Sequence, residues 1–272
     1  MALRWGDGEA YDRMMGRWSR QLAPPFVRWA RLPAGGSVLD VGCGTGSLSA
    51  ALAAAGMRRV LGIDRSPGYV AHATAAVGNG SGVVAFQVGD AMALPGRAGE
   101  FDAVVSSLVL NFVPDPAVAV REMCRVVRPG GVVAVCVWDY AGRMELARRF
   151  WDAAIALDLP GARERDEGRF PVCRPENLRR LFEDAGLEAV EVEGIEMPMV
   201  FRDFDDYWTP FLGGQGPLAG FVAGLGESDR VRFRDGLRRT LPRGPDGSIP
   251  LNGRAWTARG VRRASGDPGV GR

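Results

Sequence analysis

VLDVGCGTGSL, residues 38–48, is the stretch that decides the fold. Its apolar start is typical of a buried strand, and alternating glycines follow at positions 42, 44 and 46. The Ala- and Leu-rich segment after them predicts a helix that ends at Gly56. A strand, a glycine turn and a helix in this order predict a nucleotide-binding α/β unit, because glycine lets the backbone turn sharply and lets a ligand lie against it.

The spacing of the glycines narrows the choice of ligand. A dinucleotide loop has the pattern G-x-G-x-x-G, but Ser47 stands where its third glycine would be. A P-loop needs a lysine, and this sequence contains none. Asp40, two positions before the first glycine, suits a ligand with a cationic group near the turn. S-adenosylmethionine (SAM) has such a group in its α-ammonium, and its carboxylate suits the helix N-terminus.

The run DVGCGTG at 40–46 resembles the SAM-binding loop of class I SAM-dependent methyltransferases, in particular the type 11/25 and ubiquinone-biosynthesis methyltransferases. The strand FDAVV at 101–105 and the run RPGG at 128–131 also resemble this family. The resemblance implies an α/β fold: a Rossmann-like doubly wound sheet of seven strands, mostly parallel with an antiparallel last strand, plus helical lid insertions. It also implies methyl transfer to a small-molecule acceptor, with S-adenosylhomocysteine (SAH) as the product. The SAM contacts it implies in the loop are Asp40, Gly42, Cys43 and Gly44.

Asp64 ends the predicted second strand, 59–64. A carboxylate at this place can accept hydrogen bonds from both ribose hydroxyls, as in other nucleotide sites of this architecture. The alternative is a helix N-cap, since Ser66 and Pro67 follow and open a helix. Under the resemblance, Asp64 binds ribose, Ser66 caps the helix and Arg65 lies near the adenine.

Three further cofactor contacts follow the third and fourth strands. Asp90 comes after the strand 83–88, and the resemblance implies that its carboxylate and the N–H of Ala91 bind adenine. The alternative for Asp90 is an Asx turn after Gly89. Ser107 and Asn111 fall at the carboxyl end of the fourth strand, where an open α/β sheet binds its ligand.

The N-terminal segment 9–32 is rich in large apolar residues. It predicts two short amphipathic helices that are broken at Pro24 and Pro25. As a flap over the pocket, it would bring Tyr11, Arg17 or Trp18 to the cofactor; the alternative is a helix packed on the sheet.

We divide the chain into an N-terminal helical flap (1–35), a SAM-binding core (36–140), a part that completes the core and carries helical lid insertions (141–262), and a disordered tail (263–272). The sixth and seventh strands belong to the third part. Its insertions suggest a substrate pocket, with an apolar core as the alternative. The candidate substrate contacts are Trp151, Phe204, Tyr207, Trp208 and Phe211. Asp139 and Tyr140, after the fifth strand, are candidates for a base or a substrate contact, and no catalytic residue is assigned.

Composition excludes several classes of function. The net charge of +2 gives no argument for nucleic-acid or membrane binding, and no stretch is apolar enough to span a bilayer. The four cysteines lack a C-x-x-C pair, which favours free thiols in the cytoplasm over a zinc or disulfide framework. His72, the only histidine, lies in a surface-like helix and is expected to be solvated, so no metal site is predicted.

Two other functions stay open. A nicotinamide-dependent oxidoreductase would share the first βαβ unit and Asp64, although Ser47 and Asp90-Ala91 argue against it. A non-catalytic SAM sensor or assembly protein would keep the pocket without a base. A nucleic-acid methyltransferase is disfavoured because the fourth strand does not lead into an Asn/Asp-Pro-Pro-Tyr/Phe motif. The acceptor, the methylated atom and the oligomeric state do not follow from the sequence.

Overall fold

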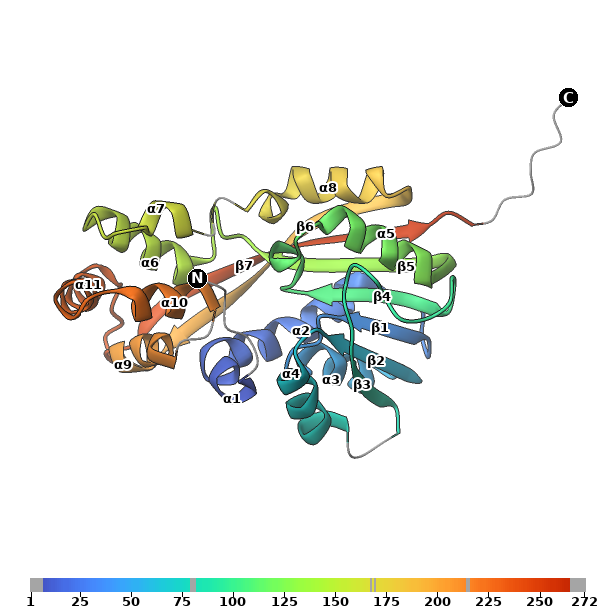
Figure 1. Ribbon diagram of the computed structural model, residues 1–272, viewed down its shortest axis with the longest axis horizontal. Helices are drawn as coiled ribbons and strands as arrows, with labels where there is room; N and C mark the ends of the chain where they lie inside the picture. The colour runs from blue at the N-terminus through green and yellow to red at the C-terminus, as the bar shows by residue number, and fades with distance from the viewer. Residues whose placement is uncertain (1–6, 79–81, 167, 169, 214–215, 265–272) are drawn as a thin grey trace, which may run out of the picture.

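The structure is a computed structural model that describes residues 7–78, 82–166, 168, 170–213 and 216–264. Its strands are β1 (Ser37–Val41), β2 (Arg59–Asp64), β3 (Val84–Val88), β4 (Phe101–Ser107), β5 (Val127–Trp138), β6 (Leu187–Phe201) and β7 (Ile249–Arg262). They form one sheet in the order β3-β2-β1-β4-β5-β7-β6 (Figure 1). The strands from β3 to β5 are parallel, and β7 runs antiparallel to both β5 and β6. The predicted doubly wound, Rossmann-like sheet of seven strands with an antiparallel last strand is therefore confirmed.

Helices cover both faces of the sheet. On one face lie α2 (Arg17–Ala30), α3 (Ser47–Ala54) and α4 (Pro67–Ala73), and on the other lie α5 (Pro116–Val126) and α8 (Pro175–Asp184) (Figure 1). The cap predicted at Ser66 is present, since its side chain accepts a hydrogen bond from the N–H of Tyr69. Asp115 caps α5 in the same way by accepting from the N–H of Ala117. The central strands are buried on both sides, which explains why they read as continuous apolar runs.

The long hairpin of β6 and β7 extends beyond the other strands and carries a group of helices at one end of the molecule (Figure 1). We call this group the helical layer. It consists of α6 (Glu145–Ala156), α7 (Ala162–Arg165), α9 (Phe204–Trp208), η6 (Thr209–Gly213), α10 (Gly216–Gly224) and α11 (Glu227–Thr240). Its core is aromatic: Phe150 packs edge-to-face on Trp151, Phe221 and Phe233 at ring-centroid distances of 5.0, 5.9 and 4.8 Å.

The N-terminal segment differs from the predicted pair of helices. After α1 (Gly8–Tyr11), the π-helical turn η1 (Asp12–Gly16) leads directly into α2, which runs through Pro24 and Pro25 without a break. The prediction of a break was wrong because the prolines lie toward the water. They take away the partners of the carbonyls of Arg20 and Gln21, and both of these residues are exposed, so water can satisfy them.

Two further expectations can be compared with the structure. His72 is not solvated but half-buried under α1, where its ring lies against Gly8. Within the described ranges, no helix has the length and hydropathy needed to cross a bilayer. The predicted disordered tail lies outside the described residues except for 263–264, as do residues 1–6 of the predicted flap.

Candidate active site

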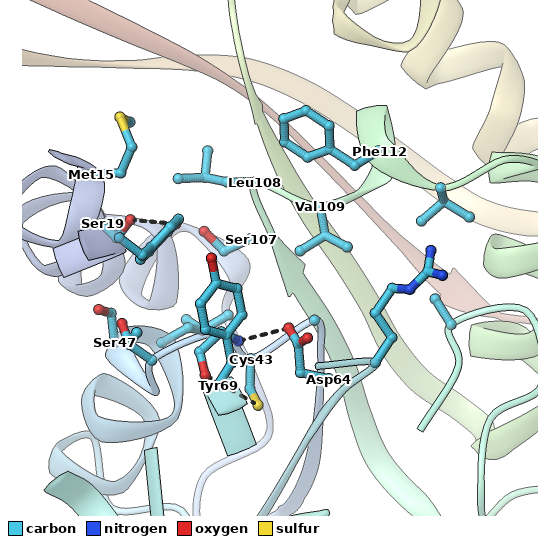
Figure 2. A pocket seen from close by; sticks show the side chains of 18 of the residues that line it. Met15, Ser19, Cys43, Ser47, Asp64, Tyr69, Ser107, Leu108, Val109 and Phe112 are labelled. Atoms are coloured by element: carbon cyan, nitrogen blue, oxygen red, sulfur yellow. Dashed lines mark hydrogen bonds between the residues drawn. The ribbon is translucent and has the colours of Figure 1, made fainter. Parts of the chain in front are cut away.

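A cavity of about 270 Å³ opens at the carboxyl ends of the parallel strands, between the sheet, the N-terminal segment and the helical layer. This is the edge at which open α/β sheets bind ligands. Two groups of lining residues differ in character. The polar half consists of Asp40, Gly42, Cys43, Gly44, Thr45, Ser47, Asp64, Arg65, Asp90 and Ala91. The apolar half consists of Met14, Met15, Leu108, Phe112, Tyr140, Met144, Pro217 and Leu218. Figure 2 shows members of both halves, with Cys43 and Asp64 on one side of the cavity and Met15 and Phe112 on the other.

The glycine loop forms the floor of the polar half. Gly42, Gly44 and Gly46 have φ values of +75°, +53° and +89°, in the region that favours glycine. A Cβ on Gly42 would lie 2.3 Å from a methyl of Val109, so this glycine also lets the turn after β4 pack on the loop. A Cβ on Gly44 would meet nothing within 4 Å, which shows that its backbone faces open space.

Asp40 lies at the end of β1 and is 1% exposed. The hydroxyl of Ser49 donates to its Oδ2 at 2.6 Å, while its Oδ1 has no hydrogen-bond partner among the described residues. Burial raises the pKa of this carboxyl to about 7, against the opposing effect of the Ser49 hydrogen bond. A buried carboxylate oxygen without a partner, in the wall of a cavity, fits a ligand that brings a cation such as an ammonium.

Asp64 ties the second strand to the glycine loop. Its Oδ2 accepts from the N–H of Gly44 at 3.1 Å, drawn in Figure 2, and its Oδ1 accepts from the N–H of Ser66 at 2.9 Å. Burial raises the pKa of Asp64, and the two backbone hydrogen bonds oppose this rise. The N-cap of α4 is Ser66, not Asp64, so the capping alternative for Asp64 is wrong. Arg65, the next residue, also lines the cavity.

Asp90 and Ala91 line the cavity beyond β3. The Asx turn that we considered is present, since the Oδ1 of Asp90 accepts from the N–H of Met92 at 2.8 Å. This turn fixes the direction of the carboxyl group, and it is compatible with a ligand on the remaining lone pairs.

The two residues predicted after β4 have different places. Ser107 lines the cavity, and its hydroxyl lies 3.1 Å from the Sγ of Cys136. Asn111, in η3 (Leu110–Phe112), is buried and is not among the lining residues. Neither amide atom of Asn111 has a partner within the described part of the chain.

The N-terminal segment reaches the cavity through Tyr11 but not through the other two predicted residues. The ring of Tyr11 lies 5.5 Å from that of Tyr69, its hydroxyl lies 3.3 Å from that of Ser19, and burial raises its pKa. Arg17 instead pairs with Asp206 at 2.9 Å and lies 4.3 Å over the ring of Trp18. This arrangement joins α2 to the helical layer and corrects the expectation that Arg17 and Trp18 face the cofactor.

Asp12 attaches the same segment to the glycine loop. The hydroxyl of Thr45 donates to its Oδ1 at 2.7 Å, and Arg20 pairs with its Oδ2 at 3.1 Å. The Nε2 of His72 lies 3.7 Å from that oxygen. No local pattern predicts this contact, because Asp12 and Thr45 are 33 residues apart in the chain.

Of the two candidate residues that follow β5, only one lies in the cavity wall. Tyr140 lines the cavity. Asp139 does not: its Oδ2 accepts from the N–H of Arg143 at 3.0 Å and lies 3.8 Å from the guanidinium of Arg254. Asp139 therefore holds the turn that leads into α6 and is not placed as a base.

The aromatic residues predicted to contact the substrate are not lining residues. Trp151, Tyr207 and Phe211 are 0–1% exposed, Trp208 is 6% exposed, and all four lie in the aromatic core of the helical layer. Phe204 stacks on Trp208 at 6.3 Å, under the guanidinium of Arg238. These five residues therefore belong to an apolar core, the alternative to a substrate pocket that the sequence left open. The helical layer instead contributes Pro217 and Leu218 of α10, and Met144 comes from the turn between β5 and α6. No pattern in the sequence around these residues predicts that they line a cavity.

In the part of the chain that the structure describes, no three His, Cys, Asp or Glu side chains gather as metal ligands. The observed polar half does fit SAM. It combines an open glycine backbone, an unpartnered buried carboxylate oxygen at Asp40 and a second carboxylate at the next strand end.

Comparisons with known proteins agree with this geometry. A family model described as a methyltransferase domain matches residues 39–135. A 2-methyl-6-phytyl-1,4-hydroquinone methyltransferase of Synechocystis sp. is 39% identical over 47% of this chain and 40% of its own length. A ubiquinone biosynthesis O-methyltransferase of Thiobacillus denitrificans is 32% identical over 72% of this chain and 82% of its own length.

A solved structure extends the comparison to the fold. Phosphoethanolamine N-methyltransferase 2 of Haemonchus contortus, in complex with S-adenosyl-L-methionine, has a TM-score of 0.58 at 19% identity, over 94% of this chain and 56% of its own. This chain spans only part of the length of some curated relatives, 40% of the Synechocystis enzyme and 57% of a Mycobacterium tuberculosis protein. The match over most of the Thiobacillus relative, together with the sheet order, shows that the chain belongs to the class I SAM-dependent methyltransferases.

Proposed function

We propose that this protein transfers the methyl group of SAM to a small-molecule acceptor. The observation that carries the proposal is the polar half of the cavity, in which the glycine loop, Asp40 and Asp64 occupy the ends of adjacent parallel strands. A second, apolar half adjoins it in the same cavity, so a cofactor and an acceptor have separate places.

Most residues of the polar half then have a role toward SAM. Asp64 accepts from the ribose hydroxyls with the lone pairs that its two backbone hydrogen bonds leave. Asp90 and the N–H of Ala91 bind the adenine, with Arg65 beside them. The Oδ1 of Asp40 receives the α-ammonium, and Gly42, Cys43 and Gly44 present backbone to the methionine part. Ser107 and Tyr11 complete the wall between the halves.

When bound, SAM supplies an electrophilic methyl carbon on a sulfonium, which a nucleophile takes as SAH leaves. The chain itself contributes position and the exclusion of water, since methyl transfer depends mainly on alignment of the two reactants. Tyr140 lines the apolar half, beside the place proposed for the acceptor. We assign no general base, because Asp139 is committed to the turn before α6.

The relatives support a small-molecule acceptor. One of them is a 2-methyl-6-phytyl-1,4-hydroquinone methyltransferase, and another is a ubiquinone biosynthesis O-methyltransferase. None of the four cysteines, all within the described residues, forms a disulfide, which favours the cytoplasm as the proposed compartment.

Calorimetric titration with SAM and SAH, with NADPH as the control, tests the proposal. We expect micromolar binding of SAM and SAH and no heat from NADPH. Binding of NADPH, or a protein that binds neither SAM nor SAH, would refute the cofactor assignment.

A further inference from the structure

The apolar half has a definite position relative to the proposed cofactor. Adenine, ribose and ammonium are assigned to the ends of β3, β2 and β1, which are neighbours in the sheet. On the other side of β1 come β4 and β5, whose ends carry Leu108, Tyr140 and Met144. The space over β4 and β5 is therefore left for the acceptor, with η1 and α10 above it.

The apolar half is lined by uncharged side chains. None of the eight residues of the apolar half carries a charge. Met144, Leu218 and Leu108 are 1%, 4% and 9% exposed, so little of each side chain is in contact with solvent. The charged side chains that line the described cavity, Asp40, Asp64, Arg65 and Asp90, belong to the polar half. A charged acceptor would lose its hydration here without gaining a partner, which is unfavourable.

Aromatic rings form part of the same wall. Phe112 and Tyr140 both pack edge-to-face on Phe170, at ring-centroid distances of 6.1 and 6.4 Å. Packing on a common ring fixes the orientation of both, so they form a rigid apolar surface.

Leu108 carries an independent sign of function. Its φ is +64°, a left-handed conformation that is unfavourable for a bulky residue. The conformation is held by its N–H, which donates to the carbonyl of Cys136 in β5 at 2.8 Å. A strained residue in a cavity wall, kept in place by the sheet, is typical of a functional site. Figure 2 shows the Leu108 side chain at the cavity, above Ser107.

We propose that the apolar half binds an uncharged, largely hydrophobic acceptor, and that Leu108 and Leu218 determine this selectivity from the sheet and from the helical layer. The proposal rests on the methyltransferase function proposed above. It excludes acceptors that carry a phosphate, a carboxylate or an ammonium on the part that the apolar half holds.

The test uses para-hexylphenol and two analogues whose hexyl chain ends in a carboxylate or an ammonium. Their binding to the SAH-saturated protein is measured by calorimetry. We expect the neutral phenol to bind at least tenfold more tightly than either analogue. Leu218→Arg should reduce the preference over the carboxylate at least tenfold, because it brings a cation into the apolar half. Leu212→Arg is the matched control: Leu212 is 55% exposed on the same layer, and its substitution should leave the ratio unchanged.

The outcomes separate this inference from the function on which it rests. Failure to bind SAH would refute the proposed function. Binding of SAH with equal or tighter binding of a charged analogue, or with no binding of any of the three probes, would overturn the uncharged-acceptor proposal. The ranking of the probes on the unsubstituted protein decides this even if Leu218→Arg does not fold.

Discussion

The two halves of the cavity are built from different parts of the chain. The polar half comes from the turns that follow β1, β2 and β3, within residues 40–91. The apolar half joins Met14 and Met15 to Leu108, Phe112 and segments as distant as Pro217–Leu218. The first is positioned by one parallel sheet, and the second exists only when the N-terminal segment and the helical layer dock on that sheet.

The difference also concerns the kind of interaction. The polar half offers directed hydrogen bonds from fixed carboxylates, so the loss of one group should change affinity in a way that depends on the ligand and on pH. The apolar half binds through the burial of apolar surface, so the truncation of one side chain there should reduce affinity less than the loss of a carboxylate. This contrast predicts an order of effects, which the following substitutions test.

The largest effect is expected at Asp64. Asp64→Ala removes the proposed acceptor for both ribose hydroxyls and should weaken SAH binding by about 100-fold, or about 2.7 kcal/mol, close to the lower end of the range for two hydrogen bonds to a charged group, about 3 kcal/mol. Calorimetry on the purified variant gives the change. Asp64→Asn is the control, since it keeps one oxygen for the N–H of Gly44 or Ser66. Unchanged affinity in Asp64→Ala would remove ribose binding from this residue.

The next effect depends on pH and on Asp40. Its pKa of about 7 in the empty site means that Asp40 is protonated below pH 7 and must lose this proton to face an ammonium. SAH affinity should therefore rise with pH, by about 25-fold between pH 5.5 and 7.5, and level off above. Calorimetric titration with SAH at several pH values in this range measures the change in affinity. In Asp40→Asn the affinity should be lower and nearly independent of pH.

Two controls isolate the Asp40 carboxyl. Methylthioadenosine has the adenine and ribose of SAH but no amino acid, so its affinity should not rise with pH. A pH dependence that came from Asp64 at the ribose would still be seen with this ligand. In the absence of ligand, the pKa of Asp40 is above the unfolded value of about 3.9. Its contribution to the free energy of unfolding is therefore present below pH 4 and is lost as pH rises to 7, and Asp40→Asn should remove that dependence. A flat SAH profile would contradict the assignment.

The polar half and the sheet could be predicted from the sequence because their determinants are local. The loop at 40–46, Asp64 at the end of β2 and Asp90 after β3 each follow an apolar strand, and parallel strands bring such ends to one edge. The break predicted at Pro24 and Pro25 was wrong, and the sequence pattern does not show why. The prolines leave the carbonyls of Arg20 and Gln21 without helical partners, and both of these residues are exposed to water.

The apolar half could not be predicted because its residues have no common pattern. Large aromatic residues in the lid, such as Trp151 and Tyr207, were attractive candidates, but bulky rings gain most by packing on one another, and they form the core of the layer. The positions left facing the cavity hold Met144, Pro217 and Leu218. Arg17 faces Asp206, 189 residues away, and no local rule finds such a pair.

The smallest effect, at Leu108, tests whether the apolar half stores strain. Glycine normally destabilises a protein relative to alanine by about 0.5–1 kcal/mol, but at a φ of +64° alanine keeps a strain of about 1–2 kcal/mol that glycine relieves. Leu108→Gly should therefore be more stable than Leu108→Ala by about 0.5–1 kcal/mol in urea unfolding. Leu110, two residues on, is also buried but lies in the 3₁₀-helix η3, and there the alanine variant should be the more stable. If the alanine variant were the more stable at both positions, Leu108 would not be strained. The apolar half would then differ from the polar half only in the kind of residue that lines it.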